Sequence, residues 1–316
     1  MNILITGIHG FVGSNLVNKL SNNHSIYGID IVNTEKKGIV TTFMWADLDK
    51  IKNISFDVII HLAGKAHDTR NQSDSKEYFK VNVELTKLIF DFFLVSGSSK
   101  FIFFSTIKAA ADIVIDDVLT ENVTPSPKGP YGESKLAAEE YILQNYNICN
   151  SNDKHIYILR PCMIHGPGNK GNLNLLYTVI KKGIPWPLGS FNNRRSFTSV
   201  DNLCYIVDNL VSKNIPSGIY NICDDETIST NDLIQIMCKT LEKKAWIWHI
   251  PKEIMRWVAI LGSFLHFPLN KERLQKLTEN YVVSNSKIKK ALGIKQMPIS
   301  AKEGLIRTFK TFENRL

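Results

Sequence analysis

Cysteine is scarce in this sequence of 316 residues, and no two of the five cysteines form a Cys-x-x-Cys pair. Their wide spacing and odd number indicate neither a structural zinc site nor a disulfide framework. The eight histidines also lack the paired spacing of metal ligands, so we predict no metal site, and we expect His61 and His67 to pack or to line a polar surface. Buried, reduced thiols are expected at Cys149, Cys162, Cys204, Cys223 and Cys238.

Long apolar runs are also missing. The longest apolar segment, "IMRWVAILGSFLHFPL" from Ile254, is interrupted by Arg256 and His266 and falls short of the roughly 20 residues that cross a bilayer. We predict a buried or interfacial helix there and no integral membrane segment. The first residues, "MNILITG", resemble a buried strand and lack the features of a secretory signal, so we expect a cytoplasmic protein.

No segment has the biased composition of a disordered tail, and 44% apolar with 22% charged residues is ordinary for a folded protein. The net charge of +8 comes from basic residues that are spread along the chain. No nucleic-acid-binding module is present, so a basic enzyme with a small anionic substrate is favoured over a protein that binds nucleic acid.

The first half of the chain alternates short, nearly continuous apolar runs with helical periodicity. This pattern predicts a Rossmann-like, doubly wound parallel sheet covered by helices on both faces. Strands are expected at residues 2 to 6, 25 to 30, 41 to 47, 56 to 63, 100 to 106 and 155 to 161, and helices at 11 to 22, 77 to 97 and 131 to 147. After Pro161 the sequence is rich in Gly, Pro and Asn. We expect a Rossmann domain at residues 1 to 163, a returning strand near 218 to 223, and a second lobe at 164 to 316, mainly for substrate binding, that is discontinuous in sequence.

The segment "ITGIHGFVGSNL" follows the first strand and opens the first helix. Glycines allow a tight turn and a close approach to a pyrophosphate, which the helix N-terminus favours electrostatically. The expected contacts come from Gly7, Gly10, Phe11, Val12 and Gly13. Asp30 ends the second strand, where its carboxylate can bind ribose hydroxyls and repel a 2′-phosphate, so NAD is favoured over NADP as the cofactor.

Tyr131 and Lys135 are four residues apart and therefore share one helix face. Alone, such a pair is most often an ordinary amphipathic surface. With the glycine turn, and with Ser105 and Thr106 at the carboxyl end of the fifth strand, it predicts a proton-transfer site. A lysine ammonium and the positive ring of oxidised nicotinamide would together lower the tyrosine pKa, which is near 10 in isolation.

The glycine spacing and several other segments resemble the extended short-chain dehydrogenases/reductases, specifically the nucleotide-sugar epimerases and dehydratases. The resemblance implies cofactor contacts from Asp47 and Leu48, from Leu62, Ala63 and Gly64, from Asn82, and from Tyr131 and Lys135. It also implies that Thr106 holds the substrate oxygen that Tyr131 protonates or deprotonates, with Ser105 as the alternative. A homodimer through the helices at 77 to 97 and 131 to 147 is implied as well.

At the substrate end, "RPCMIHGPGNKGN" and "NNRRSFTSVDNL" resemble further family segments, although His165 stands where tyrosine is common. Arg195 falls at the position that contacts the nucleotide diphosphate, which a guanidinium fork suits. Asp201 is expected to cap the helix that follows. Substrate contacts are therefore expected from Lys170, Asn172, Arg195 and Arg273.

"FFSTIK", "GPGNKGNLNLL" and "NNRRSF" look most like bacterial surface-polysaccharide enzymes that act on UDP-N-acetylhexosamines. We expect an NAD-dependent 4-epimerase of a UDP-hexose or UDP-N-acetylhexosamine. A 4-ketoreductase of a nucleotide 4-keto-6-deoxy sugar uses the same residues and remains an alternative, and a non-catalytic dinucleotide sensor is a more remote one. Ile107 and Lys108 replace the Asp-Glu pair of the dehydratases, so water loss from the sugar is disfavoured.

Overall fold

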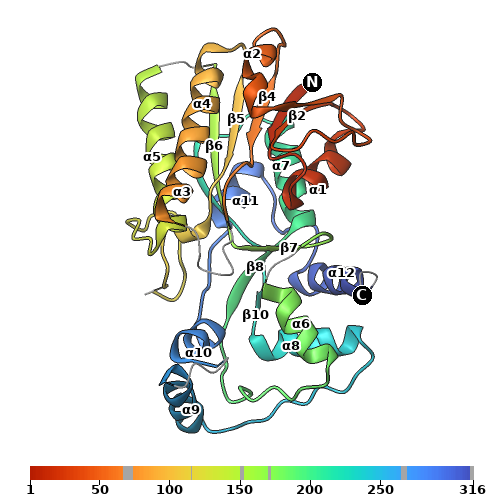
Figure 1. The fold of residues 1–316 in the computed structure, drawn as a ribbon, viewed down its shortest axis with the longest axis vertical. Helices are drawn as coiled ribbons and strands as arrows, with labels where there is room; N and C mark the ends of the chain where they lie inside the picture. The colour runs from red at the N-terminus through yellow and green to blue at the C-terminus, as the bar shows by residue number, and fades with distance from the viewer. Residues whose placement is uncertain (67–73, 115, 150–152, 170–171, 265–268, 314–316) are drawn as a thin grey trace.

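The computed structural model describes the chain except for residues 67–73, 115, 150–152, 170–171, 265–268 and 314–316. Its centre is a parallel sheet of seven strands in the order β3-β2-β1-β4-β5-β6-β9, shown in the upper part of Figure 1. The strands are β1 (Asn2–Thr6), β2 (Ser25–Asp30), β3 (Thr41–Met44), β4 (Val58–His61), β5 (Lys100–Phe104), β6 (His155–Pro161) and β9 (Gly218–Ile222). This arrangement confirms the predicted Rossmann-like fold.

Both faces of the sheet are covered because its strands are apolar at nearly every position. Ile3 and Ile5 of β1 pack in one buried cluster, with helices α1 (Phe11–Leu20), α7 (Val200–Ser212) and α11 (Ser286–Leu292). Leu4 packs in a second cluster on the opposite face, because side chains alternate along a strand. That face carries α2 (Leu48–Ile51), α4 (Leu85–Val95) and α5 (Pro130–Cys149).

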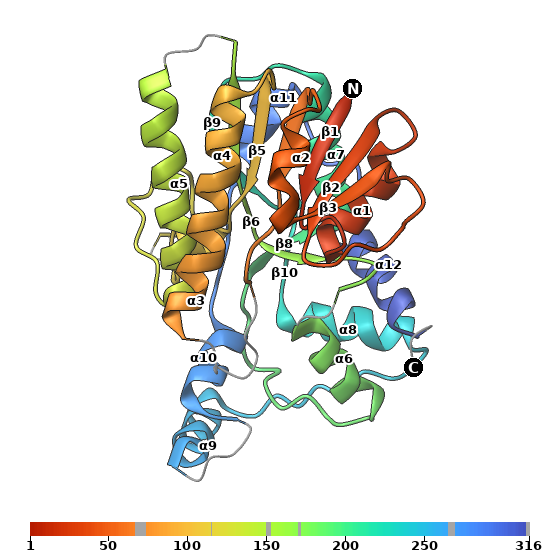
Figure 2. The ribbon, with the colours of Figure 1, turned by 45° about the horizontal axis from the view of Figure 1, so that its top comes forward.

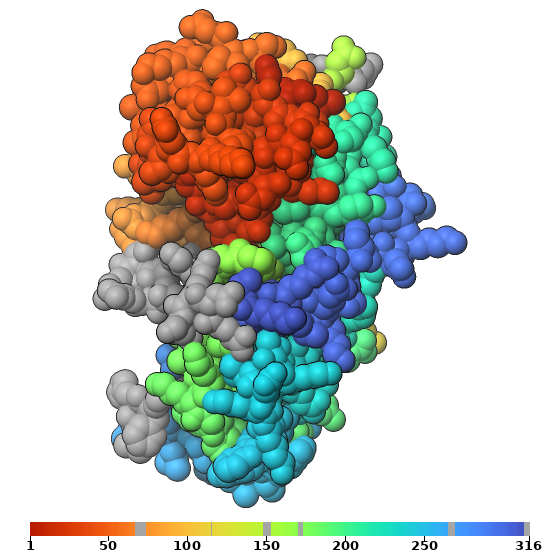
Figure 3. Space-filling model, turned by 90° about the vertical axis from the view of Figure 1, so that its right-hand side faces the viewer, coloured from red at the N-terminus to blue at the C-terminus, as the bar shows by residue number. Residues whose placement is uncertain are grey.

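A smaller lobe lies below the sheet in Figure 1 and contains a three-stranded sheet in the order β10-β8-β7. Its strands are β7 (Met163–His165), β8 (Arg195–Ser199) and β10 (Thr227–Ile228). Its helices are α6 (Asn172–Lys181), α8 (Thr230–Thr240), α9 (Lys252–Phe264), α10 (Lys271–Thr278) and α12 (Ala301–Glu313). In Figure 3 the C-terminal residues, in dark blue, lie between the N-terminal lobe and this smaller lobe.

Two local features differ from the sequence predictions. The predicted helix at 77 to 97 is divided into α3 (Ser75–Phe79), a π-helical turn (Lys80–Glu84) and α4, which run end to end along the sheet in Figure 2. The prediction that Asp201 caps α7 is wrong. Ser199 is the N-cap, since its hydroxyl accepts a hydrogen bond from the Asn202 amide, while Asp201 lies in the first turn and pairs with Arg307.

Candidate functional site

The glycine turn lies at the carboxyl end of β1, where its backbone packs too closely for side chains. Gly7 has a φ of +70°, and its amide donates to Ile29 O at 2.7 Å. A Cβ at Gly13 would lie 2.5 Å from Gly7 O and 2.6 Å from Ile8 O. Gly10 precedes α1 without a side-chain cap, so the first-turn amides are not occupied by a capping side chain. Such a backbone cradle fits the pyrophosphate of NAD.

Asp30 lies beside this turn at the end of β2 and is 8% exposed. Its carboxylate accepts hydrogen bonds from His9 N at 2.8 Å and Ile31 N at 2.7 Å. These two bonds fix the carboxylate against the glycine turn and leave acceptor capacity for ribose hydroxyls.

The other predicted cofactor contacts lie along the same edge of the sheet. Asp47 ends a 3-10 turn (Trp45–Asp47), and Leu48 opens α2. A hydrogen bond with Lys50 is the main reason that the pKa of Asp47 is lowered. The segment from Leu62 to Gly64 follows β4, and Thr6 holds it by accepting hydrogen bonds from Leu62 N at its carbonyl oxygen and from Ala63 N at its side chain.

Thr106, Tyr131 and Lys135 come from two elements that meet at the carboxyl edge of the sheet. Thr106 follows β5, and its hydroxyl forms a hydrogen bond with Tyr131 of α5. Lys135 Nζ donates to Phe104 O at 2.8 Å and lies 4.8 Å from the centroid of the Phe103 ring. The structure thus brings the three predicted residues into one small volume, next to the segment after β4.

Gly64 connects this group to Asn82. A Cβ at Gly64 would lie 3.0 Å from Lys135 Nζ and 2.9 Å from Asn82 Oδ1. Asn82 is buried in the π-helical turn, accepts from Lys65 N at 2.7 Å, and donates to Ser134 Oγ at 2.9 Å. It therefore ties the segment after β4 to the helix that carries Tyr131 and Lys135.

Burial shifts the pKa values of both residues of the pair. It raises the pKa of the Tyr131 phenol, although the hydrogen bond with Thr106 opposes the rise. Burial lowers the pKa of Lys135 to about 8, and the Glu139 carboxylate opposes that change. Burial therefore acts against the phenolate form of Tyr131 in this structure, in the direction opposite to the lowering predicted for a lysine ammonium and an oxidised nicotinamide ring.

Ser105 differs from Thr106 in its hydrogen-bond partner. Its hydroxyl donates to the carboxylate of Glu139, which also forms a fully buried ion pair with Arg160 of β6. The sequence analysis missed this pair. The only local signal is that Glu139 lies four residues after Lys135 on the same helix.

His61 is a packing residue, as expected. It is fully buried, stacks on Phe103, and forms hydrogen bonds with the hydroxyls of Thr6 and Thr86. Burial first, and then the Lys135 charge, lower its pKa to about 3, so the ring is neutral. His67 lies outside the described residues.

The predicted substrate residues are distributed over the smaller lobe. The pKa of Arg195 is lowered by burial, and its Nη1 donates to Lys276 O of α10 at 2.8 Å. Its neighbour Arg194 is exposed and donates to Thr227. Arg273 is exposed on α10. Lys170 lies outside the described residues, and Asn172 opens α6 with a side chain that is not described.

Lys108, which replaces a dehydratase acid, pairs with Asp112 at 3.0 Å. Its Nζ also lies 4.6 Å from the centroid of the Tyr281 ring. Tyr281 in turn donates to Ala111 O and so connects the segment after β5 to the smaller lobe. The second residue after Thr106 is therefore a paired cation and not a carboxylic acid.

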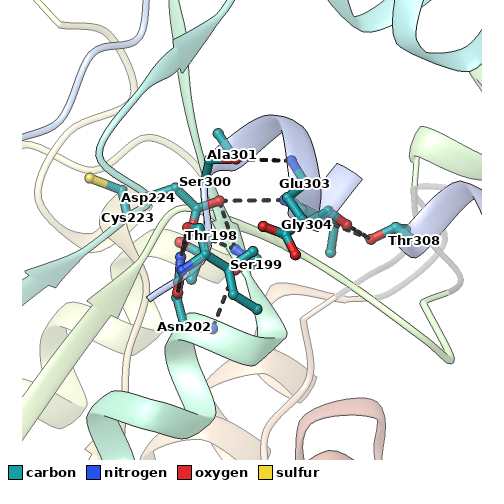
Figure 4. Close-up of polar contacts among 12 residues, drawn as sticks. Thr198, Ser199, Asn202, Cys223, Asp224, Ser300, Ala301, Glu303, Gly304 and Thr308 are labelled. Atoms are coloured by element: carbon teal, nitrogen blue, oxygen red, sulfur yellow. Dashed lines mark hydrogen bonds and ion pairs between the residues drawn. The ribbon is translucent and has the colours of Figure 1, made fainter. Parts of the chain in front are cut away.

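A buried cluster around Asp224 joins the lobes (Figure 4). Its carboxylate accepts from Ser199 N at 3.0 Å and from Asn202 Nδ2 at 2.7 Å. His165 lies next to this cluster, fully buried, with Nδ1 2.9 Å from the hydroxyl of Thr308 and Nε2 3.6 Å from Asp224. His165 is therefore part of the packing between the lobes.

Among the described residues, no group of three or more His, Cys, Asp or Glu side chains could hold a metal ion. The cysteines whose side chains are described, Cys162, Cys204, Cys223 and Cys238, are free and buried. No helix in the described part of the chain is long and apolar enough to cross a membrane.

Comparison with known proteins agrees with this geometry. The chain is 29% identical to UDP-glucose 4-epimerase of Vibrio cholerae over 98% of its own length and 95% of the relative's. It is 25% identical to N-acetyl-alpha-D-glucosaminyl-diphospho-ditrans,octacis-undecaprenol 4-epimerase of Escherichia coli O157:H7 over 98% and 94% of the two chains. The structure of UDP-glucuronic acid 4-epimerase from Bacillus cereus in complex with NAD has the same fold, with a TM-score of 0.75, 22% identity and 99% of each chain covered.

Residues 3–223, more than half of the chain, match the NAD dependent epimerase/dehydratase family. This match agrees with the predicted cofactor and with the prediction that the protein is an enzyme. The chain belongs to the NAD dependent epimerase/dehydratase family.

Proposed function

We propose that the protein is an NAD-dependent 4-epimerase of a UDP-hexose or UDP-N-acetylhexosamine. The observation that carries the proposal is the meeting of Thr106, Tyr131 and Lys135 at the carboxyl edge of the sheet, next to the glycine turn. Ligands of doubly wound sheets bind at this edge. The similarity to the Vibrio cholerae 4-epimerase over nearly the full length supports the same reaction class.

In this proposal the cofactor is held by Gly7, Gly10 and Gly13 through backbone amides and by Asp30 through the ribose hydroxyls. The segment from Leu62 to Gly64 and the pair Asp47 and Leu48 line the same edge. When bound, NAD supplies the oxidation and the re-reduction of the sugar carbon.

The chain's own residues handle the proton. Tyr131 accepts the proton of the sugar 4-hydroxyl at its phenol oxygen and later returns it, while the Thr106 hydroxyl holds the same sugar oxygen in place. Lys135 supplies a positive charge at the site without needing to move, because its Nζ is anchored to Phe104 O. Asn82 positions the segment that packs against that ammonium.

Arg195 is the proposed diphosphate contact. Its partial burial and its hydrogen bond to α10 hold the guanidinium in a defined position, and the planar set of N–H donors matches two phosphate oxygens. Epimerisation requires the oxidised sugar to turn over while it stays bound, and attachment at the diphosphate permits that rotation. Lys170, Asn172 and Arg273 remain proposed substrate contacts.

A second candidate substrate shares the diphosphate but carries a lipid in place of uridine. The relative from Escherichia coli O157:H7 is described by name as the 4-epimerase of a polyprenyl diphosphate sugar and matches 98% of this chain. Arg195 would serve either substrate, since both present the same diphosphate. With the lipid-linked substrate, the protein would make no contacts to a uracil base.

We also propose a homodimer through α4 and α5. Leu88 and Val95 of α4 are 46% and 87% exposed, which is unusual for apolar side chains on a helix next to the sheet. The buried free thiols are typical of a reducing compartment, and we propose that the protein acts in the cytoplasm.

The test is proton NMR of UDP-N-acetylglucosamine incubated with the purified protein and no added cofactor. Appearance of the galacto epimer is expected, because an epimerase regenerates its own NAD in each turnover. No epimer with this sugar, with UDP-glucose or with the polyprenyl diphosphate sugar would overturn the proposal. Reduction of a nucleotide 4-keto-6-deoxy sugar by added NADH or NADPH would then assign the ketoreductase.

A further inference from the structure

The end of the smaller lobe carries apolar side chains that the fold does not bury. Three of the five tryptophans lie there with 55% or more of their surface exposed, namely Trp246, Trp248 and Trp257. Leu261 and Phe264 of α9 are 58% and 82% exposed. We call Trp246, Trp248, Trp257, Ile260, Leu261 and Phe264 the lobe-end surface.

Helix α9 has two apolar sides, of which packing uses only one. Met255, Ala259 and Gly262 are buried against the lobe and are spaced as one face of a helix requires. Trp257, Leu261 and Phe264 repeat the same spacing on another side, and that side faces solvent. A helix that only had to cover the core would need polar residues at these positions.

The segment that leads from α8 to α9 belongs to the same end of the molecule, as Figures 1 and 2 show. Trp246 lines a shallow hollow together with Ile184 and Lys244. The hydrogen bonds between Trp186 and the backbone of Trp246 and Trp248 fix this segment to the lobe. The exposed tryptophans are therefore held on a structured surface and not on a free strand.

The charges around the lobe-end surface are mainly positive. Residues 181–184 and 241–258 contain six Lys or Arg and only two Glu. Lys182, Lys243, Lys244, Lys252 and Arg256 are exposed. Exposed tryptophans with neighbouring lysines are the composition of proteins that lie in the membrane–water interface, where the rings enter the headgroup layer and the lysines meet anionic lipids.

We propose that the lobe-end surface binds the surface of an anionic lipid bilayer, with α9 lying in the interface. A second copy of this chain fits less well, because a twofold contact would place the same basic residues against one another. The 13 residues of α9 suit a helix that lies in the interface better than one that crosses the bilayer.

The docking proposal does not rest on the proposed function, but it bears on the site. Arg195 donates to Lys276 O of α10, and α10 packs on α9. The candidate diphosphate contact is therefore one helix away from the proposed membrane contact.

The test uses the full-length protein and sedimentation with vesicles of phosphatidylcholine and phosphatidylglycerol, compared with vesicles of phosphatidylcholine alone. We expect binding to the anionic vesicles that weakens at high salt. Replacing Trp257 and Phe264 together by Ser should lower the partition coefficient at least about tenfold, since two large apolar side chains no longer enter the interface. Val40→Ser, an exposed apolar position on the other lobe, is the control.

The electrostatic part has its own pair of variants. Lys182→Gln with Lys244→Gln should weaken binding to anionic vesicles by roughly tenfold, whereas Lys290→Gln with Lys302→Gln, which changes the net charge equally, should not.

Failure of the wild-type protein to bind anionic vesicles would overturn the proposal. So would equal binding by the Trp257 and Phe264 variant, or a shift of that variant from dimer to monomer in sedimentation without vesicles, which would assign the surface to a second copy. Epimerase activity on a soluble UDP-sugar is measured in parallel and separates failure of docking from failure of the proposed function.

Discussion

Lys135 and Glu139 lie one turn apart on α5, and Glu139 opposes the effect of burial on the lysine. Burial lowers the pKa of Lys135 to about 8, while the carboxylate raises it. The carboxylate of Glu139 is already paired, because it accepts a hydrogen bond from Ser105 and forms an ion pair with Arg160. We therefore expect Glu139 to act as a positioning residue that favours the charged form of the lysine.

Glu139→Gln should move the alkaline limb of the kcat profile to lower pH, because Lys135 then loses its proton more readily. The variant should also be destabilised by about 3 kcal/mol, since Arg160 keeps a buried charge without its partner. Glu140→Gln, the exposed neighbour, should change neither quantity. An unchanged pH profile in a folded Glu139 variant would contradict the assigned role.

The Lys135 pKa also predicts how stability depends on pH. Its folded-state pKa of about 8 lies below the ordinary value of 10.5, so between these values the unfolded chain binds more protons than the folded protein. The contribution of Lys135 to the free energy of unfolding should therefore rise with pH in that window. Urea titrations of the wild-type protein and of Lys135→Met, which lacks this dependence, provide the measurement.

Tyr131→Phe removes the proposed proton acceptor and keeps the ring. Turnover should fall roughly a thousandfold, while NAD binding measured by calorimetry stays close to that of the wild-type protein. Tyr141→Phe removes a hydroxyl from the same helix, where it donates to Asp91, and should leave turnover unchanged. A variant at Tyr131 with normal turnover would remove the central residue of the mechanism.

Gly13→Ala tests the cofactor turn. The new Cβ would meet backbone oxygens at 2.5 and 2.6 Å, so the turn must shift. We expect a loss of about 1 to 3 kcal/mol in stability and NAD affinity at least about tenfold lower. Gly97→Ala is the matched control, because nothing lies within 4 Å of its Cβ position. Equal NAD affinity in both variants would argue against this turn as the pyrophosphate site.

Arg195→Lys keeps the positive charge but loses the planar guanidinium and its paired N–H donors. Binding of UDP should weaken on the order of tenfold, because an ammonium cannot donate two parallel bonds to the diphosphate. Arg194→Lys makes the same change at the exposed neighbour and should bind UDP normally. Similar affinities for the two variants would assign the diphosphate to other residues.

Leu88→Glu together with Val95→Glu should convert the proposed dimer to a monomer, because two charges enter an apolar contact. Sedimentation velocity at matched protein concentration measures the change. Leu175→Glu, an exposed position on α6, is the control. A wild-type protein that sediments only as a monomer would refute the dimer itself.

The sequence predicted the features that depend on local pattern. Strands β1, β2 and β6 have the predicted bounds, because their apolar runs end at turn residues. The juxtaposition of Thr106 with Tyr131 was also predictable, since the carboxyl ends of parallel strands share one edge. The glycine turn, the strand-end hydroxyls and the family resemblance together pointed to this group of residues.

Long-range pairings could not be predicted in this way. The ion-pair partner of Glu139 is Arg160, which lies on a different element, β6. The N-cap of α7 is Ser199 and not Asp201, and the backbone amide of Ser199 is held by Asp224. The π-helical turn around Asn82 has no signature in hydrophobic periodicity. Each of these features arises from contacts that form only after the chain has folded.

The position of Asp224 in the sequence limits where the chain could be cut into independently folded fragments. The segment that matches the family ends at residue 223, one position before this carboxylate, and a fragment ending there would leave the Ser199 amide without its acceptor. It would also lack Ile288 and Leu292 of α11, which cover one face of the main sheet. A fragment limited to the family segment would therefore expose part of the first lobe's core, because the last third of the chain completes that core.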